Sequence, residues 1–455
     1  METVASRTHN GTAKSDPQSL ERGVRQILAD KVCGSHLGLW LLVPEHLRLG
    51  TWDLLLGWTE QRPERVEPRL ALQLVHEASL CVAGLRAARS LPQAGFGLLQ
   101  GLPFMACDQA IHQLLGAHTV EQAQQLQTAL GLRRRALGDY AGKVLIIDPH
   151  RFRSHSKRRM RKHRKDPTAK ATKVGQTFFA FDGDTRQPVC FTIGTPSRTV
   201  SQATPELLGR AATILGSQAK PTLAIADAEH FSLGLIQHIQ QHTNFDLLVP
   251  AILRPAYLQR LHQMPPEQFT RRWAGYATLS TTYSSTKPKG YTFPLWVQRF
   301  GEPPAECKFS AFLCTAQRDE LPALTEDYPK RWHVEEFFNS EQALGWERAG
   351  TQNLNIRYGH MTMALLAQAV LRQLRQRLGE PMASWDARHL AKDILQGLEG
   401  DVRVTADTIV VTYYNALNTE ILRGHYENLP DKLRAQGINP EIPWLYGYKL
   451  DFRFR

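Results

Sequence analysis

Two aspartates each follow a short apolar run that is typical of a buried strand. Asp148 closes the segment KVLIID and Asp227 closes the segment TLAIAD. Strand ends are where an open α/β sheet presents its working groups, so the two carboxylates would meet if the strands are neighbours. Two close carboxylates repel each other unless a cation lies between them, and Mg²⁺ prefers such oxygens. The pair therefore predicts a cation site, although either aspartate alone is more simply explained as a turn cap.

A third acid is expected from a helix that starts near Pro329, within the segment YPKRWHVEEFFNSEQ. At about 100° per residue, Tyr328, Arg331, Glu335 and position 342 fall on one narrow stripe of that helix. Arg331 and Glu335 are one turn apart and can form an ion pair. An exposed pair of this kind is common and contributes little to stability. The apolar residues between them indicate that other sides of the helix are packed.

The densest positive charge of the chain directly follows Asp148. Nine of the fifteen residues from Arg151 to Lys165 are Lys or Arg, and they supply +9 of the formal net charge of +12. Concentrated charge of this kind is typical of a site for a polyanion, while a solvated arm or a targeting tract is the simpler alternative. The candidate phosphate contacts are Arg151, Arg153, Lys157, Arg158, Arg159, Arg161 and Lys162.

The elements that must position these residues follow from changes in pattern along the chain. Lys143 opens a series of strand, strand, strand, helix, strand, helix and strand. It includes a hairpin over residues 176–194 around an Asp-Gly turn and a helix over 204–215 that Thr204 would cap. A long apolar helix is expected over 356–378, a shorter one near 386–398, and a hairpin over 402–414. The predicted segments are a disordered tail (1–18), a helical domain (19–139), a strand-and-helix core (140–252), a β-rich insertion (253–326), the rest of the core with the Glu335 helix (327–380) and a C-terminal region (381–455).

Cysteine spacing and hydropathy argue against other classes of protein. The six cysteines form no C-x-x-C pair, so a zinc site is not expected. No apolar run approaches the roughly 18 residues of a membrane span, and no secretory signal is evident. An intracellular protein that does not bind membranes is expected.

These residues carry a resemblance to the DDE transposases of bacterial insertion sequences. The signature of that group is Tyr-x-x-Arg-x-x-x-Glu-x-x-x-x-x-x-Lys, which Tyr328, Arg331 and Glu335 match in type and spacing. The final Lys is replaced by Gln342, which removes a charge. The resemblance covers residues 143–375 and implies an α/β fold: an RNase H-like mixed sheet with flanking helices, interrupted by a β-rich insertion, beside an all-α N-terminal domain.

The resemblance also implies a mechanism and partners. Asp148, Asp227 and Glu335 would hold two Mg²⁺ ions, with Mn²⁺ as a substitute, while Arg331, Tyr328 and Gln342 contact DNA. The partners would be the terminal inverted repeats of a transposon and a target DNA. The N-terminal helical domain would recognise the ends and join two copies on DNA, in the bacterial cytoplasm with the nucleoid. The alternatives are an inactive DNA-binding derivative, for which Gln342 would be a first sign, and an RNase H-like nuclease that cuts without joining.

Overall fold

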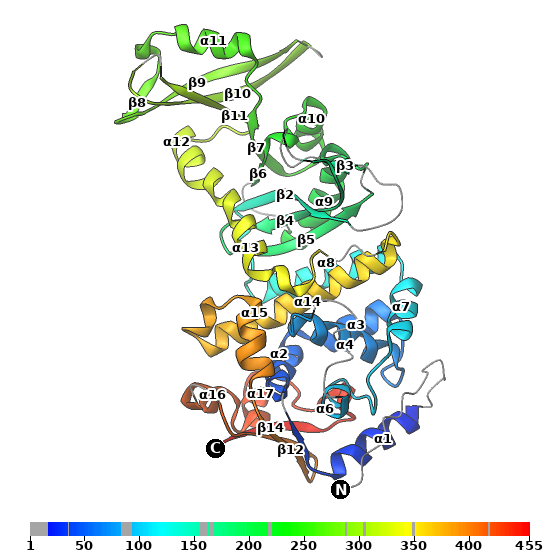
Figure 1. The fold of residues 1–455 in the computed structure, drawn as a ribbon. Coiled ribbons are helices and arrows are strands. Elements are labelled where there is room, and N and C mark those ends of the chain that lie inside the picture. The colour runs from blue at the N-terminus through cyan, green and yellow to red at the C-terminus, as the bar shows by residue number, and fades with distance from the viewer. Residues whose placement is uncertain are drawn as a thin grey trace. The chain divides into compact units, whose positions relative to one another are not determined.

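The structure is a computed structural model that describes most of the chain. The described residues are 17–34, 36–82, 93–154, 162–163, 168, 170–195, 197–216, 221–286, 289–303, 306–347, 351–416 and 419–455. They form two compact units, one from residues 1–133 with 338–455 and one from residues 134–337 (Figure 1). The six predicted segments differ in extent from these units, because the N-terminal and C-terminal parts of the chain pack into the same unit.

One ten-stranded sheet runs through the unit of residues 134–337. Its order is β3-β4-β2-β6-β7-β11-β10-β9-β8, and β5 also pairs with β4. The β-rich insertion is continuous with the core, since β11 pairs antiparallel with β7. The strands are β2 (Val144–Arg153), β3 (Lys162–His163), β4 (Thr172–Asp182), β5 (Gln187–Gly194), β6 (Thr222–Ala226), β7 (Phe245–Ala251), β8 (Thr270–Trp273), β9 (Tyr276–Thr286), β10 (Lys289–Phe300) and β11 (Lys308–Cys314).

The core strands mix parallel and antiparallel pairing, which confirms the predicted mixed α/β class. β2, β6 and β7 are parallel neighbours, whereas β4 is antiparallel to both β2 and β5. β4 and β5 form the predicted hairpin. The order of elements from β2 to β7 is the one expected from the sequence, except that the two-residue strand β3 and a short 3₁₀ segment (Ala228–His230) were not predicted.

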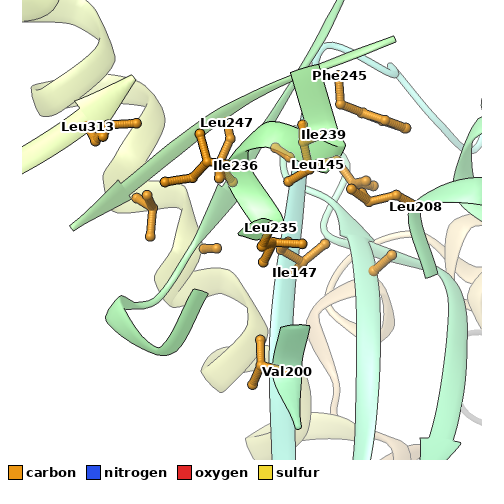
Figure 2. Close-up of a cluster of buried hydrophobic side chains, with 14 of the residues drawn as sticks. Leu145, Ile147, Val200, Leu208, Leu235, Ile236, Ile239, Phe245, Leu247 and Leu313 are labelled. Atoms are coloured by element: carbon orange, nitrogen blue, oxygen red, sulfur yellow. The ribbon is translucent and has the colours of Figure 1, made fainter. Parts of the chain in front are cut away.

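The two faces of this sheet carry different helices. Helices α9 (Val200–Leu215) and α10 (Leu233–His242) cover a continuous apolar cluster that includes Leu145, Ile147 and Leu247 (Figure 2). On the other face, Phe181 of β4 packs edge to face against Phe337 of helix α13 (His333–Glu341), with ring centroids 4.9 Å apart. Alternation along the strands decides which side chains point to each face.

Helix α9 begins four residues before the predicted start, so the expectation that Thr204 caps it is wrong. The cap is Thr199, whose side chain accepts a hydrogen bond from the backbone of Gln202 in a reciprocal capping box. Pro205 lies inside the helix instead of at its first position. The Thr204-Pro205 pair suggested a helix start because proline is frequent at the first helical position. The helix starts earlier because the capping box of Thr199 and Gln202 satisfies two backbone donors there.

The segment expected to be one regular helix from Pro329 changes type three times. It starts at α12 (Glu320–Pro322), continues as a π segment (Ala323–Asp327) and a 3₁₀ segment (Tyr328–Trp332), and becomes α-helical in α13. The prediction placed the start near Pro329 because proline favours the first helical turn. The helical path begins nine residues earlier, at Glu320.

The other unit combines helices with a small sheet of order β1-β12-β13-β14. β1 (Val32–Gly34) pairs with β12 (Gly400–Thr405), so the N-terminal region contains a strand besides its helices. β12 and β13 (Thr408–Tyr413) form the predicted C-terminal hairpin, and β14 (Lys449–Phe454) follows. The helix predicted near 386–398 is α15 (Ala387–Leu390) followed by a π segment (Ala391–Gln396).

The remaining helices lie mainly in this second unit, and the predicted long helix is confirmed as α14. They are α1 (Pro17–Ala29), α2 (Leu42–Leu49), α3 (Thr51–Thr59), α4 (Glu67–Ser79), α6 (Gln93–Leu99), α7 (Asp108–Ala117), α8 (Val120–Ala136), α14 (Leu354–Leu378), α16 (Thr419–Tyr426) and α17 (Leu429–Ala435), while α11 (Pro255–Gln263) belongs to the other unit. Throughout the described part of the chain, no helix has the length and hydropathy needed to cross a bilayer.

Candidate active site

The two aspartates lie side by side on neighbouring parallel strands. Pairing between β2 and β6 stops at Ile147 and Ala226, so Asp148 and Asp227 are the residues that directly follow the last pair. Both follow the alternation to the face opposite the apolar cluster, where α13 packs. The predicted meeting of the two carboxylates at one sheet edge follows directly from this register.

Asp148 is not at the end of its strand, which corrects the sequence prediction. β2 continues to Arg153 because β4 still pairs with it there, beyond the point where β6 has ended. The apolar run stops at Ile147 because the strand loses one of its two neighbours at that point. Burial changes there, but the extended backbone does not.

A local network fixes the carboxylate of Asp227. Its Oδ1 lies 2.7 Å from Nδ1 of His230 and accepts a hydrogen bond from the backbone N–H of Glu229. Burial would raise the pKa of Asp227, but His230 and the backbone donor together hold that pKa below its ordinary value. Asp227 is therefore kept ionised. The imidazole of His230 is buried, and its spacing of three residues from Asp227 was the only sign of this contact in the sequence.

Asp148 has the opposite electrostatic character. Burial, followed by the negative charge of Asp227, raises the pKa of Asp148 to about 6, and the Arg331 guanidinium opposes that rise. The pKa values of these two neighbouring acids are therefore shifted in opposite directions. Strongly shifted pKa values of this kind are typical of functional sites.

Arg331 lies between two of the three predicted acids. Its Nη1 is 3.6 Å from Oδ1 of Asp148, and its Nη2 is 3.4 Å from Oε1 of Glu335. The predicted contact between Arg331 and Glu335 is present, and the side chain of Glu335 is 42% exposed. Asp148, Asp227, Arg331 and Glu335 thus form one charged cluster at the end of β6. All four residues belong to the same compact unit.

Tyr328 ties this cluster to the insertion. Its ring packs edge to face on Phe312 of β11 with centroids 4.6 Å apart. Burial raises the pKa of its hydroxyl, while nearby Arg331 opposes the rise. The position of Tyr328 is therefore set by the strand that joins the insertion to the core.

Comparison with known proteins identifies the family. Residues 139–408, more than half of the chain, match the model of the transposase DDE domain. This chain belongs to that family. No curated protein matches it. A cryo-EM structure of a piggyBac transposase synaptic complex with hairpin DNA aligns at 13% identity over 84% of this chain and 80% of that chain, with a TM-score of 0.38, a likeness on which no conclusion here rests.

Enzymes of this family generally use divalent metal ions, and the cluster has suitable donors. Three carboxylates supply hard oxygen ligands of the type Mg²⁺ and Mn²⁺ accept. Burial, followed by the negative charge of Asp227, raises the pKa of Asp148, and a cation beside it would favour its ionised form. As they stand, no three His, Cys, Asp or Glu side chains in the described residues are arranged to hold a metal ion.

Gln342 does not continue the stripe of Arg331 and Glu335. Helix α13 ends at Glu341, and Gln342 begins a short 3₁₀ segment (Gln342–Leu344). The sequence expectation assumed one regular helix through position 342 and is wrong on that point. A role for Gln342 in DNA binding stays a prediction.

The basic residues after Asp148 are only partly described. The guanidinium of Arg151 forms two hydrogen bonds to the carboxylate of Glu229, so it is an ion-paired group. Arg153 and Lys162 are exposed at the end of β2 and on β3. Four of the predicted DNA contacts lie outside the described residues: Lys157, Arg158, Arg159 and Arg161. A DNA-binding role for the run stays a prediction.

Proposed function

We propose that this DDE transposase cuts DNA at the ends of a mobile element and joins the freed 3′-hydroxyl to a target strand. The observation that supports this most directly is the cluster of Asp148, Asp227 and Glu335 around Arg331 on one face of the sheet. We assign the chain to the Tyr-Arg-Glu-Lys group of bacterial insertion sequences. Its RNase H-like core would be the strand series β5-β4-β2-β6-β7.

Each residue has a distinct task in this proposal. Asp148, Asp227 and Glu335 would hold two Mg²⁺ ions, for which Mn²⁺ can substitute. Bound ions of this kind would activate the attacking oxygen and stabilise the charge on the leaving oxygen. His230 keeps Asp227 ionised and oriented through its 2.7 Å contact. Arg331 would turn its planar guanidinium to a DNA phosphate, and Tyr328 would contact the backbone beside it.

DNA is the proposed partner, as terminal inverted repeats and as target. Arg153, Lys162 and the other basic residues of the run from Arg151 to Lys165 would neutralise phosphates and release counterions. They would hold the strand without reading its sequence. End recognition and pairing of two copies on DNA are assigned to the helices before residue 139, and the site of action to the bacterial nucleoid.

One observation favours a second candidate, a DNA-binding protein that has lost catalysis. Gln342 replaces the basic residue of the signature and lies beyond the end of α13. The three acids and Arg331 are nevertheless together. An RNase H-like nuclease without joining activity would share the same cluster, so a joining assay is needed to separate them.

The experiment is a cleavage and joining assay with Mg²⁺ on DNA that carries the element's own ends. Asp148→Asn, Asp227→Asn and Glu335→Gln should each bind DNA and neither cut nor join. The matched control is Glu336→Gln, because Glu336 is the next acid on α13 and pairs with Arg186 at 3.2 Å, outside the cluster. Normal activity in the three variants would refute the proposal. Cutting without joining by the intact chain would establish the nuclease.

A further inference from the structure

A cavity of about 540 Å³ opens on the other face of the same sheet. It lies where the end of β7, helix α11 and strands β9 and β10 meet. Leu295, which lines it, belongs to the apolar cluster that α9 and α10 cover, and Ala251 packs against that cluster, whereas Asp148 and Asp227 point to the opposite face. The cavity is therefore separate from the carboxylate cluster. Its volume is in the range of sites that hold small molecules, about 300–1,000 Å³.

Aromatic rings form much of its wall. Phe231, Tyr257 and Tyr283 line it from three different elements, and Leu295 supplies a buried apolar floor. The rings of Phe231 and Tyr283 are 6.0 Å apart and nearly perpendicular, with an interplanar angle of 82°. Half-buried rings set at an angle offer both a face and an edge to a flat ligand.

Two arginines supply positive charge at the same cavity. Arg254 precedes α11 and Arg260 lies within it, and both are exposed. Neither has an ion-pair partner within the described ranges. Three other arginines of the insertion differ, because Arg271 pairs with Glu302, Arg272 with Glu320 and Arg318 with Asp246. The cavity thus places two uncompensated cations beside three aromatic rings, which suits an aromatic anion.

We infer that this cavity holds one unstacked nucleotide of a DNA strand. The base would lie among Phe231, Tyr257 and Tyr283, and its phosphates would lie against Arg254 and Arg260. Stacking on aromatic rings accepts any base, because every base has a π-face, and arginines track the backbone. This inference rests on the proposed DNA partner. It adds a second DNA contact on the face of the sheet away from the proposed catalytic acids.

Photocrosslinking of the intact full chain tests the inference without any substitution. The probe is a single-stranded oligonucleotide with one 5-iodouracil, irradiated with the protein in a chelating buffer. A stacked halogenated base couples to the aromatic ring beside it. Mapping of the coupled residue should find Tyr283, Tyr257 or Phe231. The same oligonucleotide with an abasic site at that position should bind more weakly, and dAMP, unlike inorganic phosphate, should compete for coupling.

Variants provide the second measurement. Tyr283→Leu should weaken binding of the oligonucleotide roughly 5- to 100-fold, and Tyr283→Phe should restore it, since stacking needs the ring and not the hydroxyl. Arg254→Gln and Arg260→Gln should each reduce the slope of log K against log salt by about 0.7. Arg271→Gln, which removes an ion-paired arginine of the same insertion, should leave coupling to the cavity unchanged.

The outcomes separate this inference from the proposed function. DNA that binds and couples only to residues outside the cavity overturns the inference and leaves the transposase proposal standing. Coupling at the cavity together with unchanged affinity in Tyr283→Leu also overturns it, because the ring would then only be near the strand. A chain that binds no DNA in any assay overturns both.

Discussion

In metal-free buffer, replacing Asp148 by Asn should make the unit of residues 134–337 more stable at neutral and alkaline pH. Asp148 is held in a half-buried position next to Asp227, and its pKa is about 6. Ionising Asp148 is therefore less favourable in the folded chain than in the unfolded chain, which lowers the free energy of unfolding. An amide of nearly the same shape removes that effect.

The magnitude follows from the pKa. A rise from the ordinary 3.8 to about 6 corresponds to about 3 kcal/mol, since one pKa unit equals 1.36 kcal/mol. Between these pH values the folded chain holds a proton that the unfolded chain has released, so stability falls as pH rises through this window. The side chain is 19% exposed, which makes about 3 kcal/mol an upper limit. The gain from Asp148→Asn should be full above pH 7 and vanish near pH 4.

Native-state hydrogen exchange of the β2 and β6 amides measures the stability of this unit by itself. Asp227→Asn is the matched control, and its effect should have the opposite sign. The pKa of Asp227 is lowered overall because His230 and a backbone donor outweigh burial, so its ionised form stabilises the fold above the ordinary pKa. The reasoning is refuted if Asp148→Asn gives no gain at pH 8, or a gain that does not shrink toward pH 4.

Three further predictions concern other contacts. Glu229→Gln should free Arg151 from its ion pair with Glu229, and the slope of log K for duplex DNA against log salt should become steeper by about 0.9. An unchanged slope would mean that Arg151 does not contact a phosphate. Thr199→Ala should lower the free energy of unfolding by about 1 kcal/mol in denaturant titrations, whereas exposed Thr213→Ala should have little effect. Burial lowers the pKa of His46 to about 3, so His46 should account for about 2 kcal/mol of the stability that its unit loses between pH 7 and 5. A His46→Gln variant that loses as much stability over this range would argue against this source.

Much of the core could be predicted because its strands are buried on both faces. Such strands appear as short apolar runs, and those ending near Asp148 and Asp227 were located correctly. Because β2 and β6 are parallel neighbours in register, the ends of their two apolar runs lie side by side, which places Asp148 and Asp227 next to each other. The family match over residues 139–408 agrees with the resemblance stated from the sequence.

Other features depend on partners that the sequence does not display. β2 extends past Asp148 because β4 runs beside it, and the insertion joins the main sheet because β11 pairs with β7. Neither strand pairing can be predicted from the residues of one strand alone, because the paired strands are distant in sequence. The contact between Asp227 and His230 is local, but a spacing of three residues is too common to identify it. Arg151 was counted as free charge, although an acid distant in sequence neutralises it.

The helical path to Glu335 shows how the contacts of a motif can be present although the helix type differs from the one assumed. In a 3₁₀ segment each residue advances about 120°, compared with about 100° in an α-helix. Over the three steps from Tyr328 to Arg331 the 3₁₀ turn adds up to about 360°, so these two side chains lie in line, whereas a uniform α-helix would offset them by about 60°. Arg331 accordingly acts on the hydroxyl of Tyr328 through its charge and a hydrogen bond, and the ring of Tyr328 packs on Phe312 with centroids 4.6 Å apart. The step from Arg331 to Glu335 lies mostly in α13 and keeps its contact. The change of helix type thus keeps Tyr328 beside Arg331 while its ring is anchored to the insertion.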